Sequence, residues 1–517
     1  MTFEIVFVLL SLLGMVAALV ADKMRPGMIL FSVVVLFLCA GILTPKEMLE
    51  GFSNKGMITV ALLFLVSEGI RQSGTLGQVI KKLLPQGKTT VFKAQLRILP
   101  SVAFISAFLN NTPVVVIFAP IIKHWAKSVN LPATKFLIPL SYVTILGGIC
   151  TLIGTSTNLV VHGMILEAGF EGFSMFELGK VGIFIAIAGI IYIFLFSKRL
   201  LPDARPDTAV PDEEVEEGEK LHRVEAILGA RFPGINKKLK DFNFQRHYGA
   251  EVKEIKTRNG QRFVSNLEDV VLHEGDTLVV MADDTFIPTW GESSVFVLLT
   301  NGNEPDTTGK KKRWFALLLL VLMIVGATVG ELPITKEMFP GIKLDMFFFV
   351  SITTIIMAWT NLFPARKYTK YISWDILITI ACAFAISKAM VNSGVADSVA
   401  KFIIGLSDDY GPHVLLAMLF IITNLFTELI TNNAAAALAF PLALSIASQL
   451  GVSPTPFFVV ICMAASASFS TPIGYQTNLI VQGIGNYKFT DFVRIGLPLN
   501  IITFLISIIL IPLIWNF

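Results

Sequence analysis

The chain has 517 residues, of which 54% are hydrophobic and only 15% are charged, whereas a soluble domain carries about 25% charged residues. The net charge of +3 is small and no basic, aromatic-rich stretch is present, so the composition indicates a polytopic α-helical membrane protein and gives no sign of nucleic-acid binding. All four cysteines lie in apolar runs, which predicts buried thiols and neither disulfides nor a metal site.

The first half, residues 1–200, is predicted to be a transmembrane repeat. Its apolar runs are 3–20, 28–43, 57–70, 98–122, 136–166 and 181–197. The first run lacks a basic start and a cleavage pattern, so we expect a membrane span and not a signal peptide. The run 98–122 is interrupted at 110–113 and is too short to cross the bilayer twice, which predicts a re-entrant hairpin.

A soluble insert of about a hundred residues follows the first half. We expect an acidic linker at 201–220, a small α+β domain at 221–300 and a polar linker at 301–313. Within the domain, short β-type runs alternate with turn signals. These runs are 224–228, 263–265, 270–272 and 277–281.

The string NLEDVVLHEGDTL at 266–278 resembles the C-terminal regulatory domain of TrkA-type potassium-uptake proteins, an RCK C-terminal-like domain. The resemblance covers roughly residues 220–285. No G-x-G-x-x-G motif precedes it, so a dinucleotide-binding Rossmann unit is not expected. Two roles stay open, a module that senses a small regulatory ligand or dimerises, and a passive domain that adds stability.

The second half, residues 314–517, repeats the order of the first. Its runs are 314–330, 344–361, 374–390, 415–449, 456–482 and 495–515. IGTSTNLVVHG at 153–163 matches IGYQTNLIVQG at 473–483 at seven of eleven positions, and FLVSEGIRQSG at 64–74 pairs with FAISKAMVNSG at 384–394. Each half then holds five spans and one hairpin. Because five is odd, the second copy must enter the membrane from the opposite side, as two inverted repeats.

The distribution of charge favours the same inversion. Residues 71–97 include six bases and no acid, whereas 391–417 include one base and three acids. By the positive-inside rule the first segment is cytoplasmic and the second external. The insert is then cytoplasmic and both chain ends are external, in a cell membrane (plasma or inner).

Each half carries two polar breaks in its apolar runs, at 110–112 and around Gly154, and at 431–433 and around Gly474. Thr112 before proline predicts a helix N-cap followed by the first helical residue. An asparagine before Ala434 predicts a second N-cap. Helix N-termini bind anions, and unwound carbonyls coordinate Na⁺.

None of the four breaks contains lysine or arginine. A dianion would therefore be held by neutral donors and by sodium, and it would be released once sodium leaves. This pattern favours a sodium-coupled symporter that works by alternating access. Each negative charge moved inward against the membrane potential costs roughly 2.3 kcal/mol per 100 mV. Two Na⁺ cancel the two charges of a dianion, so at least two Na⁺ are expected per dianion.

At these breaks the chain resembles the divalent anion:sodium symporter family, which carries sulfate and di- or tricarboxylates. That family's hairpin motif, Ser-Asn-Thr, corresponds to residues 110–112 and 431–433 here. The resemblance implies a homodimer and two sodium sites, with backbone carbonyls from Ile430 and Gly474. The implied sodium ligands are Ser106, Asn110, Asn111 and Gly154 at the first site and Thr427, Ile430, Asn432 and Gly474 at the second. The implied substrate contacts are Asn110, Asn111, Thr112, Thr155, Thr431, Asn432, Asn433, Tyr475 and Gln476.

The chain departs from the family after each glycine, where the family tends to have proline and this chain has Thr155 and Tyr475. The bulk of Tyr475 and Gln476 would shrink the site. Members of the family with a TrkA-type insert also resemble sulfate transporters more often than dicarboxylate transporters. Both points favour sulfate as the substrate.

Other functions are weighed against this one. A sodium-coupled di- or tricarboxylate transporter is the nearest alternative. A sodium/proton antiporter of related architecture is more distant, because it needs a titratable carboxylate and none lies within the breaks. Glu428, next to Thr427, is given either a modulating or a structural role. A potassium-channel filter is missing from the sequence, and no nucleophile–base or metal set predicts an enzyme.

Overall fold

The computed structural model of the chain describes residues 3–21, 24–85, 87–203, 222–229, 232–257, 261–283, 286, 290, 295–300, 310–338, 341–406 and 411–517. The linkers predicted at 201–220 and 301–313 lie largely outside these residues. Helix α13 begins at Lys310, so the basic residues 310–313 belong to a helix and not to the predicted linker.

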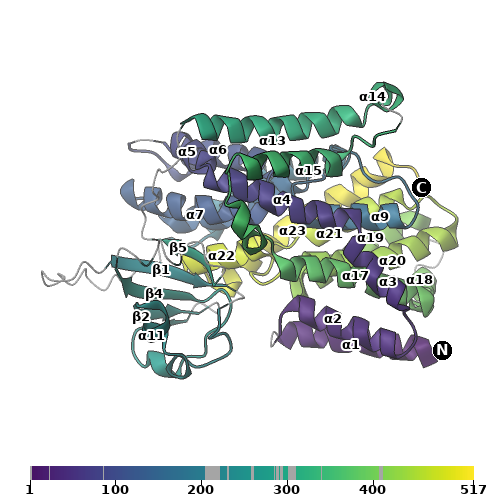
Figure 1. The fold of residues 1–517 in the computed structure, drawn as a ribbon, viewed down its shortest axis with the longest axis horizontal. Coiled ribbons are helices and arrows are strands. Elements are labelled where there is room, and N and C mark those ends of the chain that lie inside the picture. Colours follow the sequence, from purple (N-terminus) through teal and green to yellow (C-terminus); the bar gives the residue numbers. More distant parts are fainter. Residues whose placement is uncertain are drawn as a thin grey trace, which may run out of the picture.

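Helices form both halves of the chain (Figure 1). The first half contains α1 (Phe3–Ala21), α2 (Pro26–Cys39), α3 (Pro45–Glu50), α4 (Lys55–Gln72), α5 (Thr75–Leu83), α6 (Val91–Ser106), α7 (Asn111–Ser128), α8 (Leu137–Gly148), α9 (Ser156–Glu167) and α10 (Gly179–Leu200). The second half contains α13 (Lys310–Gly330), α14 (Pro333–Met338), α15 (Met346–Trp359), α16 (Tyr368–Tyr371), α17 (Trp374–Asn392), α18 (Val395–Leu406), α19 (Gly411–Leu429), α20 (Asn432–Leu450), α21 (Thr455–Ser466), α22 (Gln476–Gly485) and α23 (Phe489–Ile514).

Helix positions recur at a nearly constant offset along the chain. In residues along the sequence, α15 starts as far after α2 as α22 starts after α9. Helices α2 and α15 also have the same length. The starts of α7 and α20, Asn111 and Asn432, are separated by almost the same offset. The order of runs predicted twice from the sequence is therefore present twice as a succession of helices.

The sheet and the chain ends occupy opposite ends of the molecule (Figure 1). In that view α5, α6 and α7 lie on the left with the sheet, whereas α18, α19 and α20 lie on the right with both termini. The helices of the two halves form one buried cluster, with side chains such as Phe37, Phe118, Tyr142 and Phe457 at its centre.

Seven helices in the described part of the chain are long and apolar enough to cross a membrane. Several of them expose large apolar side chains along one side, as on α10 at Ile183, Ile187, Ile191 and Leu195. A contiguous exposed apolar face of this kind marks a surface that water does not cover in the functional state. The protein is thus a multi-pass membrane protein.

The chain segment that connects the two helical halves contains five antiparallel strands. They form one sheet in the order β3-β2-β4-β1-β5. The strands are β1 (His222–Leu228), β2 (Glu251–Lys256), β3 (Arg262–Phe263), β4 (Thr277–Ala282) and β5 (Phe296–Thr300), with one short helix, α11 (Phe244–Tyr248). The sheet has its own apolar cluster, in which Phe232 packs among Phe242, Tyr248 and Phe296.

The strand predictions are confirmed in part. The runs at 224–228 and 277–281 lie in β1 and β4. Of the run at 263–265, only Phe263 lies in a strand, at the end of the two-residue β3. The run at 270–272 makes only an isolated bridge, between Lys238 and Val271. It lies between a 3-10 turn at Leu267–Asp269 and the turn at Gly275, which leaves too few residues for a ladder. Strands β2 and β5 were not predicted.

We predict that Gly147→Ala lowers the stability of the helical part. Helices α6 and α8 cross so closely at Gly147 that an added methyl group would fall inside contact distance of the Ala103 carbonyl. Overpacking of this kind costs roughly 1–3 kcal/mol, and small residues set close helix approach in membranes. Thermal unfolding in detergent measures the effect. The matched control is Gly14→Ala, whose new methyl group would meet no atom within 4 Å; equal melting temperatures for the two variants would contradict the prediction.

Candidate functional site

Four non-helical segments, here called the four breaks, separate helices inside the bundle. They are 107–110 between α6 and α7, 149–155 between α8 and α9, 430–431 between α19 and α20, and 467–475 between α21 and α22. None of these segments contains a charged residue. They coincide with the polar breaks predicted from the sequence.

The helix starts at the first and third breaks differ from the predicted capping. Asn110 is the N-cap of α7, so Thr112 and Pro113 lie inside its first turn. Thr431 is the N-cap of α20, so Asn432 is its first helical residue. Neither N-cap side chain bonds to the helix backbone. The side chains of Asn111 and Asn432, at the first helical positions, bond to the preceding helices instead.

The predicted first sodium ligands lie close together, with the exception of the Asn110 side chain. Ser106 Oγ donates to Asn111 Oδ1 at 2.7 Å, and both residues are fully buried. A Cβ added to Gly148 would lie 2.7 Å from Asn111 Oδ1 and 3.1 Å from the Gly154 carbonyl oxygen. The hydroxyl, the amide oxygen and the Gly154 carbonyl therefore face one small volume.

Among the predicted second sodium ligands, a hydroxyl again lies beside an asparagine oxygen. Thr427 Oγ1 lies 3.1 Å from Asn432 Oδ1 and 2.6 Å from the Ala465 carbonyl oxygen, and its one hydrogen can serve either acceptor. The Thr427 carbonyl oxygen lies 2.5 Å from where a Cβ on Gly474 would be. It also accepts a bond from Ser468 Oγ at 3.4 Å. Ile430, in the same break, is buried.

Two threonines and two asparagines fix the backbone of the second and fourth breaks. Gly154 N–H donates to Thr151 Oγ1 at 3.1 Å, and Gly474 N–H donates to Thr471 Oγ1 at 3.2 Å. Asn158 Nδ2 donates to the Thr151 carbonyl at 2.9 Å, and Asn478 Nδ2 donates to the Thr471 carbonyl at 3.1 Å. These residues were missed as site residues. The available signal was that the same residue types recur at equivalent positions of both halves.

The two halves of the chain meet at the breaks. Asn111 Nδ2 donates to the Tyr475 hydroxyl at 2.6 Å, and that hydroxyl shares a bond of 3.2 Å with Thr155 Oγ1. Thr112 Oγ1 donates to Gln476 Oε1 at 3.3 Å. Each of these bonds joins residues from opposite halves. The start of α7, which follows the first break, therefore lies against the fourth break.

The converse contact joins the third break to the second. Ser156 Oγ and Thr157 Oγ1 lie 3.2 and 3.3 Å from Asn433 Oδ1. Asn432 and Asn433 are both nine-tenths buried. The structure thus joins predicted contacts from both halves and adds Ser156 and Thr157, which sequence reasoning did not include. The side chains of Asn110 and Thr431 are not among the groups joined by these bonds.

An acidic side chain, that of Glu428 at the end of α19, contacts the fourth break. Its Oε1 accepts from the Ser470 N–H at 2.8 Å and from Asn500 Nδ2 at 2.7 Å. Its carbonyl accepts from Thr471 Oγ1 at 3.2 Å. Glu428 therefore holds the fourth break in place. This supports a structural role for Glu428 over a modulating one.

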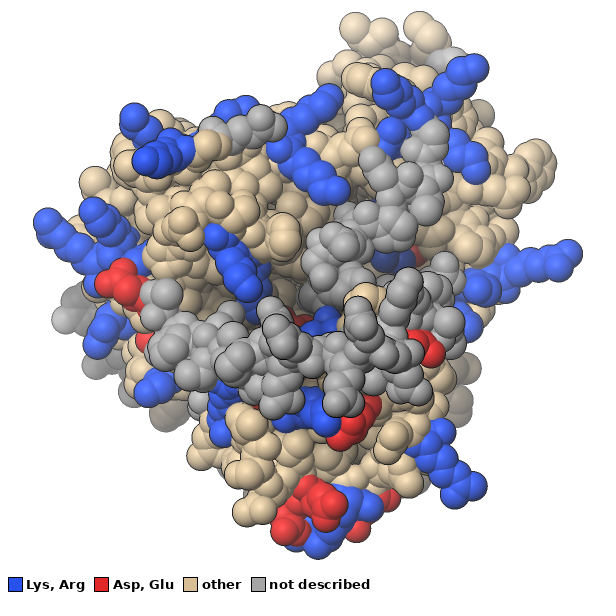
Figure 2. Space-filling model, turned by 90° about the vertical axis from the view of Figure 1, so that its left-hand side faces the viewer, with Lys and Arg blue, Asp and Glu red and all other residues tan. Residues whose placement is uncertain are grey.

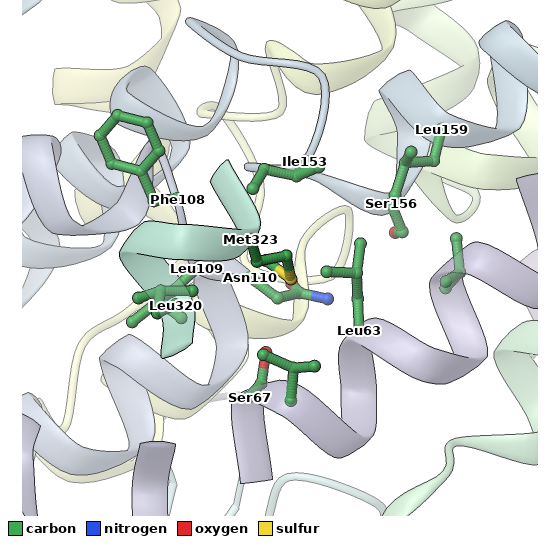
Figure 3. Close-up of a pocket in the computed structure, with 12 residues that line it drawn as sticks. Leu63, Ser67, Phe108, Leu109, Asn110, Ile153, Ser156, Leu159, Leu320 and Met323 are labelled. Carbon is green, nitrogen blue, oxygen red and sulfur yellow. The ribbon is translucent and has the colours of Figure 1, made fainter. Parts of the chain in front are cut away.

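Asn110 lines a pocket beside the first break (Figure 3). Its amide, Ser67 and Ser156 are the polar groups among otherwise apolar side chains such as Leu63 and Met323. The pocket is small, with a volume of about 10 Å³, which is room for about one water molecule. It adjoins the first break, between α4, α9 and α13.

The arrangement can bind an anion and cations together. The N-termini of α7, α9, α20 and α22 begin at the four breaks, where free N–H groups and the helix dipole favour negative charge. The side-chain and carbonyl oxygens of the same segments suit a hard cation. No basic side chain from the breaks themselves neutralises an anion, so cations would have to do so.

Proteins of similar sequence are transporters. An uncharacterized transporter of Synechocystis sp. is 30% identical over 94% of this chain and 93% of its own length. Sodium/sulfate cotransporter 2 of Chlamydomonas reinhardtii is 31% identical over 54% of this chain and 31% of its own length. The Na⁺/citrate cotransporter of Rattus norvegicus is 29% identical over 25% of this chain and 23% of its own length. The family model CitMHS, described as citrate transporter, matches residues 16–449 and 348–516, so the chain belongs to the citrate transporter family, whose members are transporters and not enzymes.

Proposed function

We propose that this protein is a sodium-coupled symporter that imports a divalent oxyanion, most favourably sulfate, by alternating access. The observation that carries the proposal is the convergence of four uncharged breaks, each beginning a helix, around two hydroxyl–asparagine pairs. Such a site can hold a dianion only when cations accompany it. Binding and release of the anion then depend on sodium.

Sodium is supported by two sets of oxygens. What the two sets share is a hydroxyl beside an asparagine oxygen, Ser106 with Asn111 in the first and Thr427 with Asn432 in the second. The Gly154 carbonyl joins the first set, whereas Gly474 packs against the Thr427 carbonyl in the second. Sodium coupling is also named for relatives from Chlamydomonas reinhardtii and Rattus norvegicus. Two Na⁺ per dianion make import electrically neutral, and a third would let the membrane potential drive it.

Sulfate is favoured over larger anions by Tyr475. Its ring occupies the space between the first and fourth breaks, and its hydroxyl already takes the Asn111 amide donor. A compact tetrahedral anion needs less room than citrate or succinate. The family description and the rat relative keep a sodium-coupled di- or tricarboxylate transporter as the alternative. A sodium/proton antiporter is disfavoured because the breaks hold no carboxylate and the carboxylate of Glu428, which contacts the fourth break, is engaged in holding that break in place.

The proposed architecture is a pair of inverted repeats, 1–200 and 314–517, each with five spans and one re-entrant hairpin. The α6–α7 pair lies toward the sheet and the α19–α20 pair toward the chain ends (Figure 1), as opposite insertion requires. The sheet, at 221–300, would be a cytoplasmic TrkA-C-like domain. Lysine and arginine side chains gather on the end that carries it (Figure 2), which supports a cytoplasmic location. We also propose a homodimer in the plasma or inner membrane.

Uptake of radiolabelled sulfate into proteoliposomes should require an inward sodium gradient. Unlabelled molybdate and thiosulfate should compete, because they are compact tetrahedral anions, whereas succinate should not. Sodium-dependent uptake of succinate without uptake of sulfate would replace sulfate by a dicarboxylate. Failure of both anions would reject the proposed class of substrate.

Asn111→Ala and Asn432→Ala should each raise the sodium concentration for half-maximal uptake by about 10- to 150-fold. Each removes an amide oxygen from one proposed sodium site, and a hydrogen bond or contact to a charged group contributes about 1.5–3 kcal/mol. Sodium titration of uptake measures the shift. Asn392→Ala is the control, because Asn392 is exposed and bonds to Glu47 at 3.1 Å, away from the breaks. A normal sodium dependence in both site variants would reject the assigned ligands.

Tyr475→Ala should relax the selectivity of the site so that succinate inhibits sulfate uptake. Removal of the ring opens space beside Asn111 and Thr155, whereas Tyr475→Phe keeps the ring and removes only the hydroxyl. The phenylalanine variant should retain sulfate selectivity with an affinity about 5- to 150-fold weaker, because a buried amide donor loses its partner. Tyr368→Ala, at an exposed position, serves as control. Competition by succinate unchanged in Tyr475→Ala would show that Tyr475 does not limit substrate size.

A further inference from the structure

The sheet contacts the helical part through the two helices that start at the first and fourth breaks. Strand β5 packs against α7. The turn before β4 packs against α22, where Gly275 approaches Leu479 and Thr277 approaches Gly483. Ile227 of β1 is 1% exposed and belongs to the same buried apolar cluster as the membrane helices. The sheet is therefore docked on this surface and not tethered beside it.

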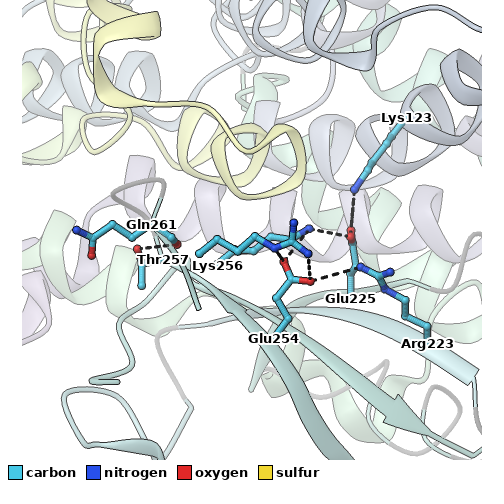
Figure 4. Close-up of polar contacts among 8 residues, drawn as sticks. Lys123, Arg223, Glu225, Glu254, Lys256, Thr257 and Gln261 are labelled. Carbon is cyan, nitrogen blue, oxygen red and sulfur yellow. Dashed lines mark hydrogen bonds and ion pairs between the residues drawn. The ribbon is translucent and has the colours of Figure 1, made fainter. Parts of the chain in front are cut away.

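An ion bridge crosses the contact between the sheet and α7 (Figure 4). Lys123 Nζ of α7 lies 2.9 and 3.2 Å from the two carboxylate oxygens of Glu225 on β1. Glu225 also lies 3.3 Å from Lys256 Nζ on β2, and the Lys256 side chain is only 6% exposed. Such largely desolvated pairs fix geometry, because separating them leaves an unpaired buried charge.

A second ion cluster supports the bridge from inside the sheet. Glu254, 2% exposed, pairs with Arg262 at 2.5 Å. It also lies 3.6 Å from Arg223 (Figure 4). Burial opposes ionisation of Glu225, but Lys123 and Lys256 outweigh it and lower its pKa to about 2. The carboxylate is therefore charged throughout the physiological range. Its contribution to docking is complete above the ordinary glutamate pKa and is lost only as the pH falls toward 2.

The same two helices place substrate contacts at their other ends. Lys123 lies 12 residues after Asn111 in α7, about 18 Å along the helix axis. Gly483 lies seven residues after Gln476 in α22, about 10 Å along the axis. Helices α7 and α22 pack against each other, and their starts are joined by the bond from Thr112 to Gln476.

We propose that the sheet docks on α7 and α22 as a clamp that positions the substrate site, with Glu225 as its positioning residue. Docking fixes the relative position of one helix from each half, and thereby holds Asn111 and Thr112 against Tyr475 and Gln476. Undocking weakens substrate binding and leaves the translocation step intact. The inference rests on the proposed function only in using anion uptake as its readout.

Glu225→Gln and Lys123→Gln should each raise the KM for sulfate about 2- to 30-fold, the range found for residues that couple distant sites, with kcat within twofold of wild type. The double variant should show less loss than the sum of the two single variants, because both single changes remove the Lys123–Glu225 pair. Lys123→Arg keeps the charge and should restore most of the affinity. The control is Glu251→Gln, which breaks the exposed Glu251–Lys253 pair on the same sheet.

A disulfide tests the clamp directly. Thr277→Cys with Gly483→Cys, in a chain whose four native cysteines are replaced by alanine, should cross-link on oxidation. A Cβ on Gly483 lies 2.8 Å from Thr277 Oγ1, close to the about 3 Å that separates a Cβ from the partner sulfur in a disulfide. The oxidised protein should transport normally. When Glu225→Gln is added to it, the cross-link should restore the wild-type KM, and reduction should bring the KM defect back.

Three results would overturn the clamp. The first is an unchanged KM in Glu225→Gln, and the second is an equal rise in KM in Glu251→Gln. The third is loss of uptake in the cross-linked protein, which would mean that the sheet has to undock from the helices during transport. The rate of cross-linking gives a readout independent of transport, since Glu225→Gln should slow it severalfold and an unchanged rate would remove Glu225 from the clamp. If wild type carries succinate and not sulfate, the proposed substrate fails while the same KM comparison, made with succinate, still tests the clamp.

Discussion

A helix that is interrupted inside a bilayer leaves backbone N–H and C=O groups that lipid cannot satisfy. The structure meets this constraint from within the breaks themselves. Thr151 and Thr471 accept from the glycine N–H groups, and their carbonyls accept from Asn158 and Asn478. Each glycine is thereby held so that the next helix starts toward its neighbours. Without these bonds the helix N-termini and carbonyls would have no fixed position, and neither an anion nor sodium would find a prepared site.

Duplication accounts better for the proposed cation sites than for the proposed anion site. The hydroxyl–asparagine pairs Ser106–Asn111 and Thr427–Asn432 are equivalent in the two halves, as expected if each binds the same kind of ion. The halves differ where they face each other. Tyr475 stands where the first half has Thr155, and its hydroxyl bonds to both Thr155 and Asn111. A single anion bound between two repeats does not need a symmetric environment. The two halves can therefore differ at this contact between them, and the difference can set selectivity for the anion.

The sequence predicted the parts of the site that repeat and missed those that depend on contact between the halves. The recurring strings located the breaks around Gly154 and Gly474. The other two breaks were located by polar residues that interrupt apolar runs, which are visible without any tertiary information. The capping roles of Thr112 and the asparagines were misassigned, since Asn111 and Asn432 bond to the preceding helix and not to their own. The pairing of Asn433 with Ser156 and Thr157 joins residues from opposite halves of the chain, which no local pattern encodes. Strand β2 was missed because most of its residues are charged, and two of these, Glu254 and Lys256, are buried in ion pairs.

The position of the sheet has a mechanical consequence that follows from helix rigidity. A helix transmits a displacement of one end to the other, and a site whose donors sit at helix N-termini is sensitive to displacements well below the length of a hydrogen bond. The sheet holds α7 and α22, the helices that bring Asn111 and Gln476 to the site from opposite halves. A soluble domain that touched only one of them would move with that half and leave the relative position of the two unchanged. Contact with both makes the docked sheet a constraint on the distance between the halves, and that distance is the quantity on which shared anion contacts depend.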